Sequence, residues 1–473
     1  MISTRRLLQV GGVILAGFVF ANGAVAQAPT APAPAPVQPP VQPPVQPTPL
    51  PDLQRADSYL PFLYGPLDAA GMVAPLATKG AKTHILPATP ATTQWGWFDS
   101  NQAPVLKVNS GDTIVMETMT ASHNQIVPGV TMDQLVKMRN DFPGRGPHTV
   151  TGPIYVEGAE PGDILRIKFN KIVPRPYASN MNLPGILGAF PKEFPQGQIK
   201  YFYLDNEKKQ MEFAPGIVVP LRPFPGTIAV ARAEPGKYNT VPPGRYGGNL
   251  DLREMTEGTT LYLPVFMKGA LVWTGDSHAG QGNGEINLTA IETAFQEFNI
   301  TVDVIKQTPL EWPRVETPTA WITIGYDRDL NKALDLLKSE TVKFIVEQRK
   351  VSRAQAEKIM LETWNCPISE VVNVVKGTYC MVPKQARSPR PAALPKQDNA
   401  KFFVTYAKDA DLEKAMNSAA LAMIAAIVEK KKLTRLDAYS LSSIAMDCRI
   451  GPHTTGDKEV HCMMPKSLWV GSK

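Results

Sequence analysis

One glycine-rich stretch gathers polar side chains of the kinds that bind metals and move protons: WTGDSHAGQGNGEINLTAIE, residues 273–292. On an extended backbone, side chains two residues apart share a face, so Asp276 and His278 would point the same way. Such a pair can hold a divalent cation, and Glu285 could supply a third ligand, which is the general pattern of a hydrolytic zinc-type site. The spacing fits a hydrogen-bonded structural turn equally well.

The glycines of this stretch indicate a backbone that either adopts unusual dihedral angles or approaches something closely. We expect them to let backbone N–H groups face a bound molecule. Ser277 is adjacent to His278, and neighbours on a strand point in opposite directions, so a Ser–His nucleophile pair is not expected. No Lys-Ser/Thr pair follows the glycines, which argues against a phosphate-binding loop.

Other loops carry residues of similar types. His123 lies in TMTASHNQIVPG and His148 in GRGPHTVTGP, although a single histidine in a loop is more often solvated than a ligand. GGNLD places Asn249 and Asp251 two residues apart, which repeats the spacing of the Asp-x-His pair. Several such loops in one region favour a shared site over isolated turns.

The loops that carry these polar residues connect short β-rich runs, which are separated by proline and glycine. Between Tyr59 and Pro318 these runs include APVLKVNSGDTIVMET, GPIYVEGAEPGDILRIKF and TTLYLPVFMKGALVWT, with little helical periodicity. The pattern predicts a mainly antiparallel β body over residues 59–318, either a sandwich or a barrel.

The N-terminus has the three parts of a secretory signal: Arg5 and Arg6, an apolar run, and a small-residue cleavage site. This predicts a cleaved signal peptide over residues 1–26, a periplasmic or secreted protein, and no stable membrane insertion after cleavage. The arginine pair partly fits a twin-arginine export signal. Residues 27–58 are proline-rich and predict an extended linker.

The charge of the chain limits its partners. A formal net charge of +6 over 473 residues is too weak to predict nucleic-acid binding. A chain of this length is expected to form two or three domains.

The last third of the chain contains a duplication. Comparing it with itself gives a gapless match at an offset of 82 residues, with Asp327/Asp409, Cys366/Cys448 and Cys380/Cys462 among the coinciding pairs. Each copy has an apolar face at helical spacing, followed by a second helix that Ser352 or Thr434 would cap. The sequence therefore predicts two α+β units, over residues 319–390 and 400–473.

All four cysteines lie in these copies, and an exported protein meets an oxidising compartment, so they are expected to form disulfides. Three pairings are open, and the repeat favours Cys366–Cys380 and Cys448–Cys462. A free thiol nucleophile or a cysteine metal site is the competing interpretation. Disulfides argue against a nitrilase-type amidase, which needs a free active-site cysteine.

Several motifs together resemble the acetamidase/formamidase family over residues 59–469. They are HTVTGPIYVEGAEPGD, GGNLD, LYLPVFMKGAL, GDSHAGQGNGEINLTAIE and the closing AYSLSSIAMD and VHCMMPKSLW. The resemblance implies hydrolysis of short linear amides, such as formamide or acetamide, to a carboxylic acid and ammonia. It also implies a β-sandwich-like body with an α+β C-terminal part, and a homo-oligomer.

The resemblance assigns roles to the polar residues of these motifs. Asp276, His278 and Asp251 are expected to hold a divalent metal, with His148 as the alternative third ligand. Zinc fits this set, and manganese or calcium would also suit carboxylate-rich ligands.

The remaining motif residues are expected to act on the substrate. Glu285 would be the general base or proton shuttle, and His148 a second catalytic residue. Asn249, Gln281 and His123 would bind and orient the amide.

Departures from the family pattern keep other functions open. Relatives often have aspartate where this chain has Thr120 or Asn283, and the duplication, the export signal and the disulfides are further differences. A non-catalytic exported binding protein, or a hydrolase of another C–N bond such as a carbamate, are the alternatives.

Overall fold

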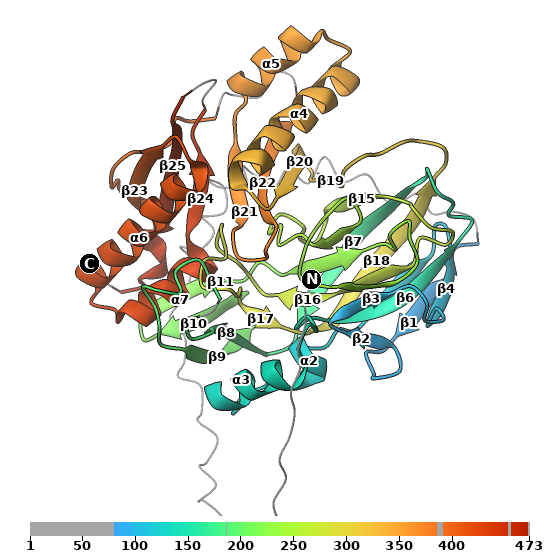
Figure 1. The fold of residues 1–473 in the computed structure, drawn as a ribbon, viewed down its shortest axis with the longest axis horizontal. Helices are drawn as coiled ribbons and strands as arrows, with labels where there is room; N and C mark the ends of the chain where they lie inside the picture. The colour runs from blue at the N-terminus through green and yellow to red at the C-terminus, as the bar shows by residue number, and fades with distance from the viewer. Residues whose placement is uncertain (1–79, 186, 386–390, 453–455, 472–473) are drawn as a thin grey trace, which may run out of the picture. The chain divides into compact units, whose positions relative to one another are not determined.

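The computed structural model describes residues 80–185, 187–385, 391–452 and 456–471 (Figure 1). The predicted signal peptide and linker, residues 1–58, lie outside the described residues, as does the start of the predicted body, residues 59–79. None of the helices in the described ranges has the length and apolar content that a membrane crossing needs.

Two large, mostly antiparallel sheets dominate the fold. The first has 12 strands in the order β1 (Thr83–Leu86), β5 (Thr113–Met116), β18 (Phe295–Ile305), β7 (Ile164–Pro174), β15 (Thr260–Pro264), β19 (Arg314–Glu316), β20 (Ala320–Asp327), β22 (Lys376–Pro383), β21 (Cys366–Glu370), β24 (Asp447–Ile450), β25 (Lys458–Pro465) and β23 (Phe402–Asp409). The second has 11 strands. Its main path is β11 (Ile217–Pro220), β10 (Gln210–Ala214), β9 (Gln198–Asp205), β8 (Tyr177–Asn182), β17 (Glu292–Thr293), β16 (Val272–His278), β12 (Phe224–Ala229) and β14 (Gly247–Asn249).

A side branch completes the second sheet. β6 (Thr149–Glu157) pairs with β16, and β2 (Thr93–Trp95) and β4 (Leu106–Asn109) pair with β6. A separate two-stranded sheet joins β3 (Trp97–Asp99) to β13 (Lys237–Asn239). Of the described pairs between named strands, only β1–β5 and β4–β6 are parallel.

The core of the body lies between these sheets. Alternate residues of β7 and β18, such as Phe169 and Ile300, contribute to the same buried cluster as Phe224 of β12 and Trp273 of β16. Because alternate side chains of a strand share a face, each sheet presents its apolar face to the other. The prediction of a mainly β body is confirmed, and the described strands form an open sandwich and not a closed barrel.

The duplication predicted from the sequence forms two matching units. The first contains β20, α4 (Leu330–Arg349), α5 (Arg353–Glu362), β21 and β22. The second contains β23, α6 (Leu412–Lys431), α7 (Arg435–Ala445), β24 and β25. Asp329 and Asp411 accept backbone N–H bonds at the starts of the long helices, and Ser352 and Thr434 do so at the starts of the second helices.

The two units extend the first sheet of the body in one direction. β20 pairs with β19, and β21 of the first unit pairs with β24 of the second, as can be followed in Figure 1. The bridges Cys366–Cys380 and Cys448–Cys462 link paired strands within each unit, so the predicted pairing is confirmed. The described residues contain no free cysteine.

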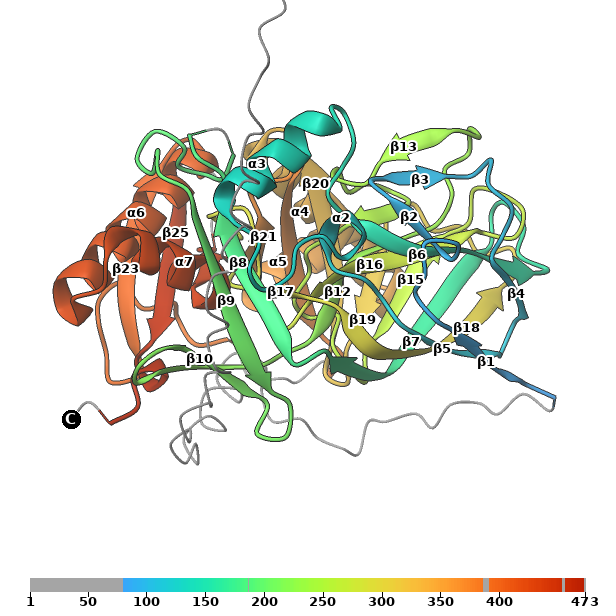
Figure 2. The same ribbon diagram turned by 90° about the horizontal axis from the view of Figure 1, so that it is seen from below.

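Two short helices lie close to the second sheet. α2 (Ala121–Asn124) precedes α3 (Met132–Asp141), whose first turn has a capping box between Thr131 and Gln134. Leu135 of α3 packs with Met181 of β8, and Figure 2 shows α3 alongside this strand. This contact becomes one wall of the cavity described below.

Candidate functional site

Strand β16 and its neighbours bring the central acidic and imidazole groups together. Asp276 and His278 lie at the end of β16, although Asp276 has a positive φ of 50° and is not in the extended conformation that the Asp-x-His prediction assumed, and Glu292 of β17 lies directly opposite His278. His278 Nε2 is 3.5 Å from an oxygen of Asp276 and 3.4 Å from one of Glu292. Asp251 follows β14, and its Oδ1 is 3.7 Å from His278 Nδ1.

Several polar atoms of this cluster have no hydrogen-bond partner although they are buried. Both ring nitrogens of His278 and Oδ1 of Asp251 lack one in the described part of the chain. Because buried polar atoms are almost always satisfied, such atoms require an explanation, and a bound cation would provide one.

The donor set fits a divalent metal. Ligand atoms of Asp251, Asp276 and His278 all lie within 4.8 Å of one another, and so do those of His278, Glu285 and Glu292. Gly226 borders this space, because a Cβ added there would be 2.5 Å from Cε1 of His278 and 2.7 Å from Oδ2 of Asp276. One imidazole with several carboxylates suits zinc or manganese.

The backbone at the acidic residues adopts an uncommon conformation. Asp251, Asp276 and Glu285 all have positive φ, at 43°, 50° and 48°. A left-handed backbone at a residue other than glycine is costly and persists where the surrounding structure imposes it. Three such acids in one cluster favour a functional site over a structural turn.

Burial separates the acid strengths within the cluster. It raises the pKa of Asp251 and of Glu285 well above the usual range, and neighbouring carboxylates add to the effect. Burial also acts to raise the pKa of Asp276, but His148 and His278 outweigh it and lower that pKa to about 2. Groups whose pKa values are pushed in opposite directions in one pocket are typical of acid–base sites.

The pKa values of His148 and His278 are shifted in opposite directions. Burial lowers the pKa of His148, against the effect of Asp276 and Glu292, so its ring is neutral at pH 7. Burial acts in the same direction on His278, but Glu292 and Asp276 raise the pKa of His278 well above its usual value. His148 is therefore the better proton acceptor, and its Nε2 is 3.8 Å from Oδ2 of Asp276.

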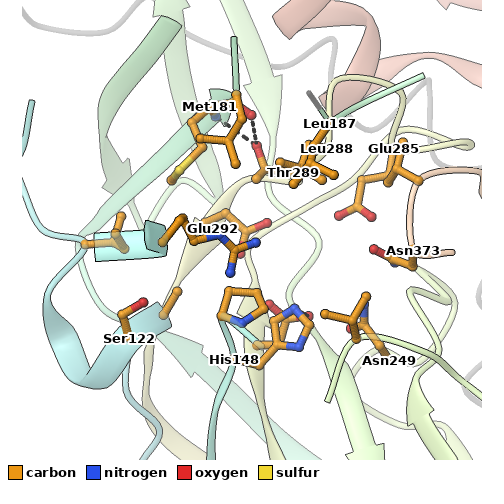
Figure 3. Close-up of a pocket in the computed structure, with 18 of the residues that line it drawn as sticks. Ser122, His148, Met181, Leu187, Asn249, Glu285, Leu288, Thr289, Glu292 and Asn373 are labelled. Atoms are coloured by element: carbon orange, nitrogen blue, oxygen red, sulfur yellow. Dashed lines mark hydrogen bonds and ion pairs between the residues drawn. The ribbon is translucent and has the colours of Figure 1, made fainter. Parts of the chain in front are cut away.

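The cluster opens onto a cavity of about 370 Å³. Figure 3 shows His148, Asn249, Glu285 and Glu292 directed toward one space, with Met181 and Leu288 on a different side of it from His148. Thr227 donates a hydrogen bond to Oδ1 of Asn249, at 2.7 Å, which fixes the side chain that lines the cavity.

The first C-terminal unit supplies part of the cavity wall. The loop between β21 and β22 contributes Val372, Asn373 and Val374. Asn373 donates a hydrogen bond to Oδ2 of Asp251, so this loop also orients a member of the cluster. Glu370 anchors the loop by accepting from the backbone N–H groups of residues 372 and 373.

Two predicted substrate-binding residues lie outside the cavity lining. The ring of His123 lies against that of Trp95, with centroids 5.8 Å apart, and its Nε2 is 3.2 Å from Oγ1 of Thr93. Gln281 donates to the backbone carbonyls of Asp251 and Ser369. Among the described residues, Gln281 thus positions the chain that carries Asp251.

Two glycines of the glycine-rich stretch, Gly282 and Gly284, hold it against the C-terminal units. Gly282 approaches α7, where an added Cβ would be 2.8 Å from the carbonyl oxygen of Ser442, and Gly284 has φ of 99°. Their N–H groups donate to the carbonyls of Ser443 and Ser369. The expectation that these N–H groups face the substrate is therefore wrong for both. Ser277 points away from the cluster and bonds to Thr118, as expected.

Sequence reasoning missed Glu292 and Asn373. Glu292 ends the motif that contains Asp276, but its role depends on the pairing of β17 with β16. Asn373 is 122 residues from its partner Asp251 in the sequence, and no local sequence pattern predicts their contact.

Asn283 does not line the cavity, whereas Thr120 does. Asn283 donates to Oδ1 of Asp447 at 2.6 Å, and Asp447 also pairs with Arg253 and Arg449. An aspartate at position 283, as in many relatives, would place its carboxylate against that of Asp447. The asparagine of this chain avoids that repulsion and donates to Asp447, a residue of the second C-terminal unit. The residue at position 283 therefore stabilises the glycine-rich loop and is not placed to contact a molecule in the cavity.

We expect Asp447→Asn to lower the free energy of unfolding by about 3 kcal/mol, because the buried guanidinium groups of Arg449 and Arg253 both lose their ion pair with the Asp447 carboxylate. Burial acts to raise the pKa of Asp447, but Arg449 and Arg253 hold it below its usual range. The stabilisation is therefore present above the ordinary carboxyl pKa and disappears as pH falls through the folded-state value. Urea unfolding at neutral and acidic pH measures both effects.

The matched control is Asp457→Asn, since this exposed carboxylate is 3.8 Å from Nζ of Lys408 at the surface. Its loss should cost less than about 1 kcal/mol. Equal losses in the two variants would contradict a stabilising role for the buried network.

Comparison with known proteins agrees with this geometry. The acetamidase of Mycolicibacterium smegmatis is 28% identical over 218 residues, which cover 34% of this chain and 54% of the relative. The formamidase of Methylophilus methylotrophus is 27% identical over 238 residues, 36% of this chain and 57% of the relative. The matched region thus spans about half the length of these curated relatives.

A solved acetamidase from Bacillus halodurans superimposes with a TM-score of 0.58 at 28% identity, covering 63% of this chain and 97% of that one. The sequence model of the acetamidase/formamidase family matches residues 91–237 and 232–325, which include every member of the cluster. The chain belongs to the acetamidase/formamidase family.

Proposed function

We propose that this protein is an exported, metal-dependent amidohydrolase that cleaves the C–N bond of linear amides to a carboxylic acid and ammonia. One observation carries the proposal: a buried cluster of carboxylates surrounds His278, whose ring nitrogens have no hydrogen-bond partner among the described residues, and the cluster opens onto a cavity of about 370 Å³. The names of the curated relatives, acetamidase and formamidase, support the same reaction class.

Asp251, Asp276 and His278 would hold the metal, with Glu292 beside them. When bound, a divalent cation supplies Lewis acidity and lowers the pKa of a water molecule that contacts it. Zinc is our first expectation, with manganese or calcium as alternatives.

His148 and Glu285 would move the protons. Because its pKa is lowered by burial, neutral His148 can accept a proton from the attacking water. Glu285 has a pKa raised well above its usual value by burial, so it can hold a proton and deliver it to the leaving nitrogen. Both side chains line the cavity.

Asn249 would orient the amide. Its carboxamide oxygen accepts a hydrogen bond from Thr227, so the amide nitrogen is the group that would donate to a ligand in the cavity. An N–H donor in this place can bind the carbonyl oxygen of the substrate, whose negative charge grows during attack.

The N-terminal sequence supports export, and we propose a periplasmic or secreted location for the processed chain. If this is right, protein recovered from the periplasm or medium should begin near residue 27, as N-terminal sequencing or intact mass would show. A full-length chain retained in the cytoplasm would contradict export. A homo-oligomer is a further proposal, which the native mass of the same preparation tests.

Purified protein should release ammonia from linear amides and contain stoichiometric divalent metal. Glu285→Gln should lower kcat by about 100-fold, because general acid–base groups contribute on this order. The matched control is Glu297→Gln on β18, whose carboxylate pairs with Lys171 at the surface. Full activity of Glu285→Gln would reject the proton role. A folded, metal-loaded protein that releases no ammonia from any amide would favour the non-catalytic binding protein.

Gly226→Ala should weaken binding of zinc or manganese by at least about tenfold, because the added methyl group occupies space between His278 and Asp276. Titration calorimetry on the metal-free protein measures this affinity. Gly236→Ala is the control, since its Cβ would meet only the ring of Tyr238 at 3.4 Å. Unchanged metal affinity in Gly226→Ala would place the metal elsewhere.

A further inference from the structure

A cavity-lining arginine has no partner in the described part of the chain. The guanidinium of Arg139, on α3, makes no hydrogen bond or ion pair there, although the residue is half-buried and lines the cavity. Burial lowers the pKa of Arg139, which reflects lost hydration of a charged group. A cation that loses water without gaining an anion is costly, so its position calls for an anionic ligand.

Arg139 lines the cavity together with a group of apolar side chains, here called the apolar wall. It is one helical turn after Leu135, and side chains four residues apart share a face of a helix. Leu135 packs with Ile126, Met181 and Leu183, and all four line the cavity. The cavity therefore offers an apolar surface together with the guanidinium.

The carboxylates of the cluster do not neutralise Arg139. The ion pairs found for Asp276 and Glu292 go to His148 and His278, and none within 4.0 Å goes to Arg139. The guanidinium therefore has no counter-ion in the described part of the chain, and its charge is close enough to His148 to act to lower the pKa of that ring. Arg328 also lines the cavity, but it is exposed and water can solvate it.

The cavity is also large enough for a ligand longer than formamide or acetamide. Its volume of about 370 Å³ equals that of about a dozen water molecules. Formamide or acetamide would fill only a small part of it, and neither has a chain of methylene groups that could be buried against the apolar wall.

We propose that the preferred substrates are amides whose acyl chain ends in a carboxylate, with the carboxylate bound by Arg139 and the methylene groups by the apolar wall. This rests on the proposed amidase function. In the reaction, water forms the new C–O bond, the C–N bond breaks, and the leaving nitrogen gains a proton. The products are a dicarboxylate and ammonia.

Matched substrate pairs test the proposal. Hexanamide and adipamate differ only by a carboxylate in place of the terminal methyl group, as do pentanamide and glutaramate. We expect wild-type kcat/KM to be at least about tenfold higher for the acid of each pair, and Arg139→Gln to reduce this ratio at least about tenfold. Lys137→Gln removes the same charge from α3 at an exposed position and should leave the ratio unchanged.

A binding measurement separates this inference from the proposed function. Adipate, the dicarboxylate product, should raise the thermal unfolding temperature of the wild type and of Lys137→Gln, but not of Arg139→Gln. Ammonia release with equal ratios in wild type and Arg139→Gln would overturn the inference and leave the amidase function intact. Without any ammonia release, Arg139-dependent stabilisation by adipate would still support the anion site, and its absence would overturn it.

Discussion

The structure is organised around a buried imidazole among carboxylates that cannot all be ionised without compensation. Asp251, Asp276 and Glu285 are within the reach of His278, in a region where charges are weakly screened. The conflict is reduced by opposite pKa shifts, with Asp276 ionised and Glu285 protonated more readily than usual. The same arrangement leaves a space suited to a cation. The shifted pKa values, the positive φ angles of the acidic residues and the candidate metal site thus all belong to the one cluster around His278.

The elements around this cluster fix it from several directions. The carbonyl of Gly226 accepts the N–H groups of Leu250 and Asp251, which holds the acidic residue beside β12. Thr227 bonds to both Asn249 and Asp276. These contacts replace side-chain freedom with fixed orientation, which catalysis by positioned groups requires.

The duplicated units have diverged into different tasks. The first unit enters the site through Asn373 and supports it through Glu370, whose pKa burial raises to about 8. The corresponding positions of the second unit in the sequence are Thr455 and Pro452, so it lacks these groups. The second unit instead holds the glycine-rich loop, through Asp447 and the carbonyl of Ser443.

The sequence by itself determined what depends on local patterns. Alternating runs identified the β body, the 82-residue offset identified the repeated segment and its disulfide pairing, and the glycine-rich motif identified Asp276 and His278 as candidates. Each of these follows from the period of a strand, from a repeat or from a local motif, which the order of residues contains directly.

The tertiary structure alone decided which distant residues meet. Glu292, Asn373 and Arg139 come to the cavity from a paired strand, a repeat loop and a helix, and no motif joins them to the cluster. It also showed that Gly282 and Gly284 allow close packing against the C-terminal units, and that Asn283 donates to Asp447 and does not line the cavity. Burial, hydrogen bonding and cavity shape arise from contacts across the sheets, and these contacts have no fixed spacing along the chain.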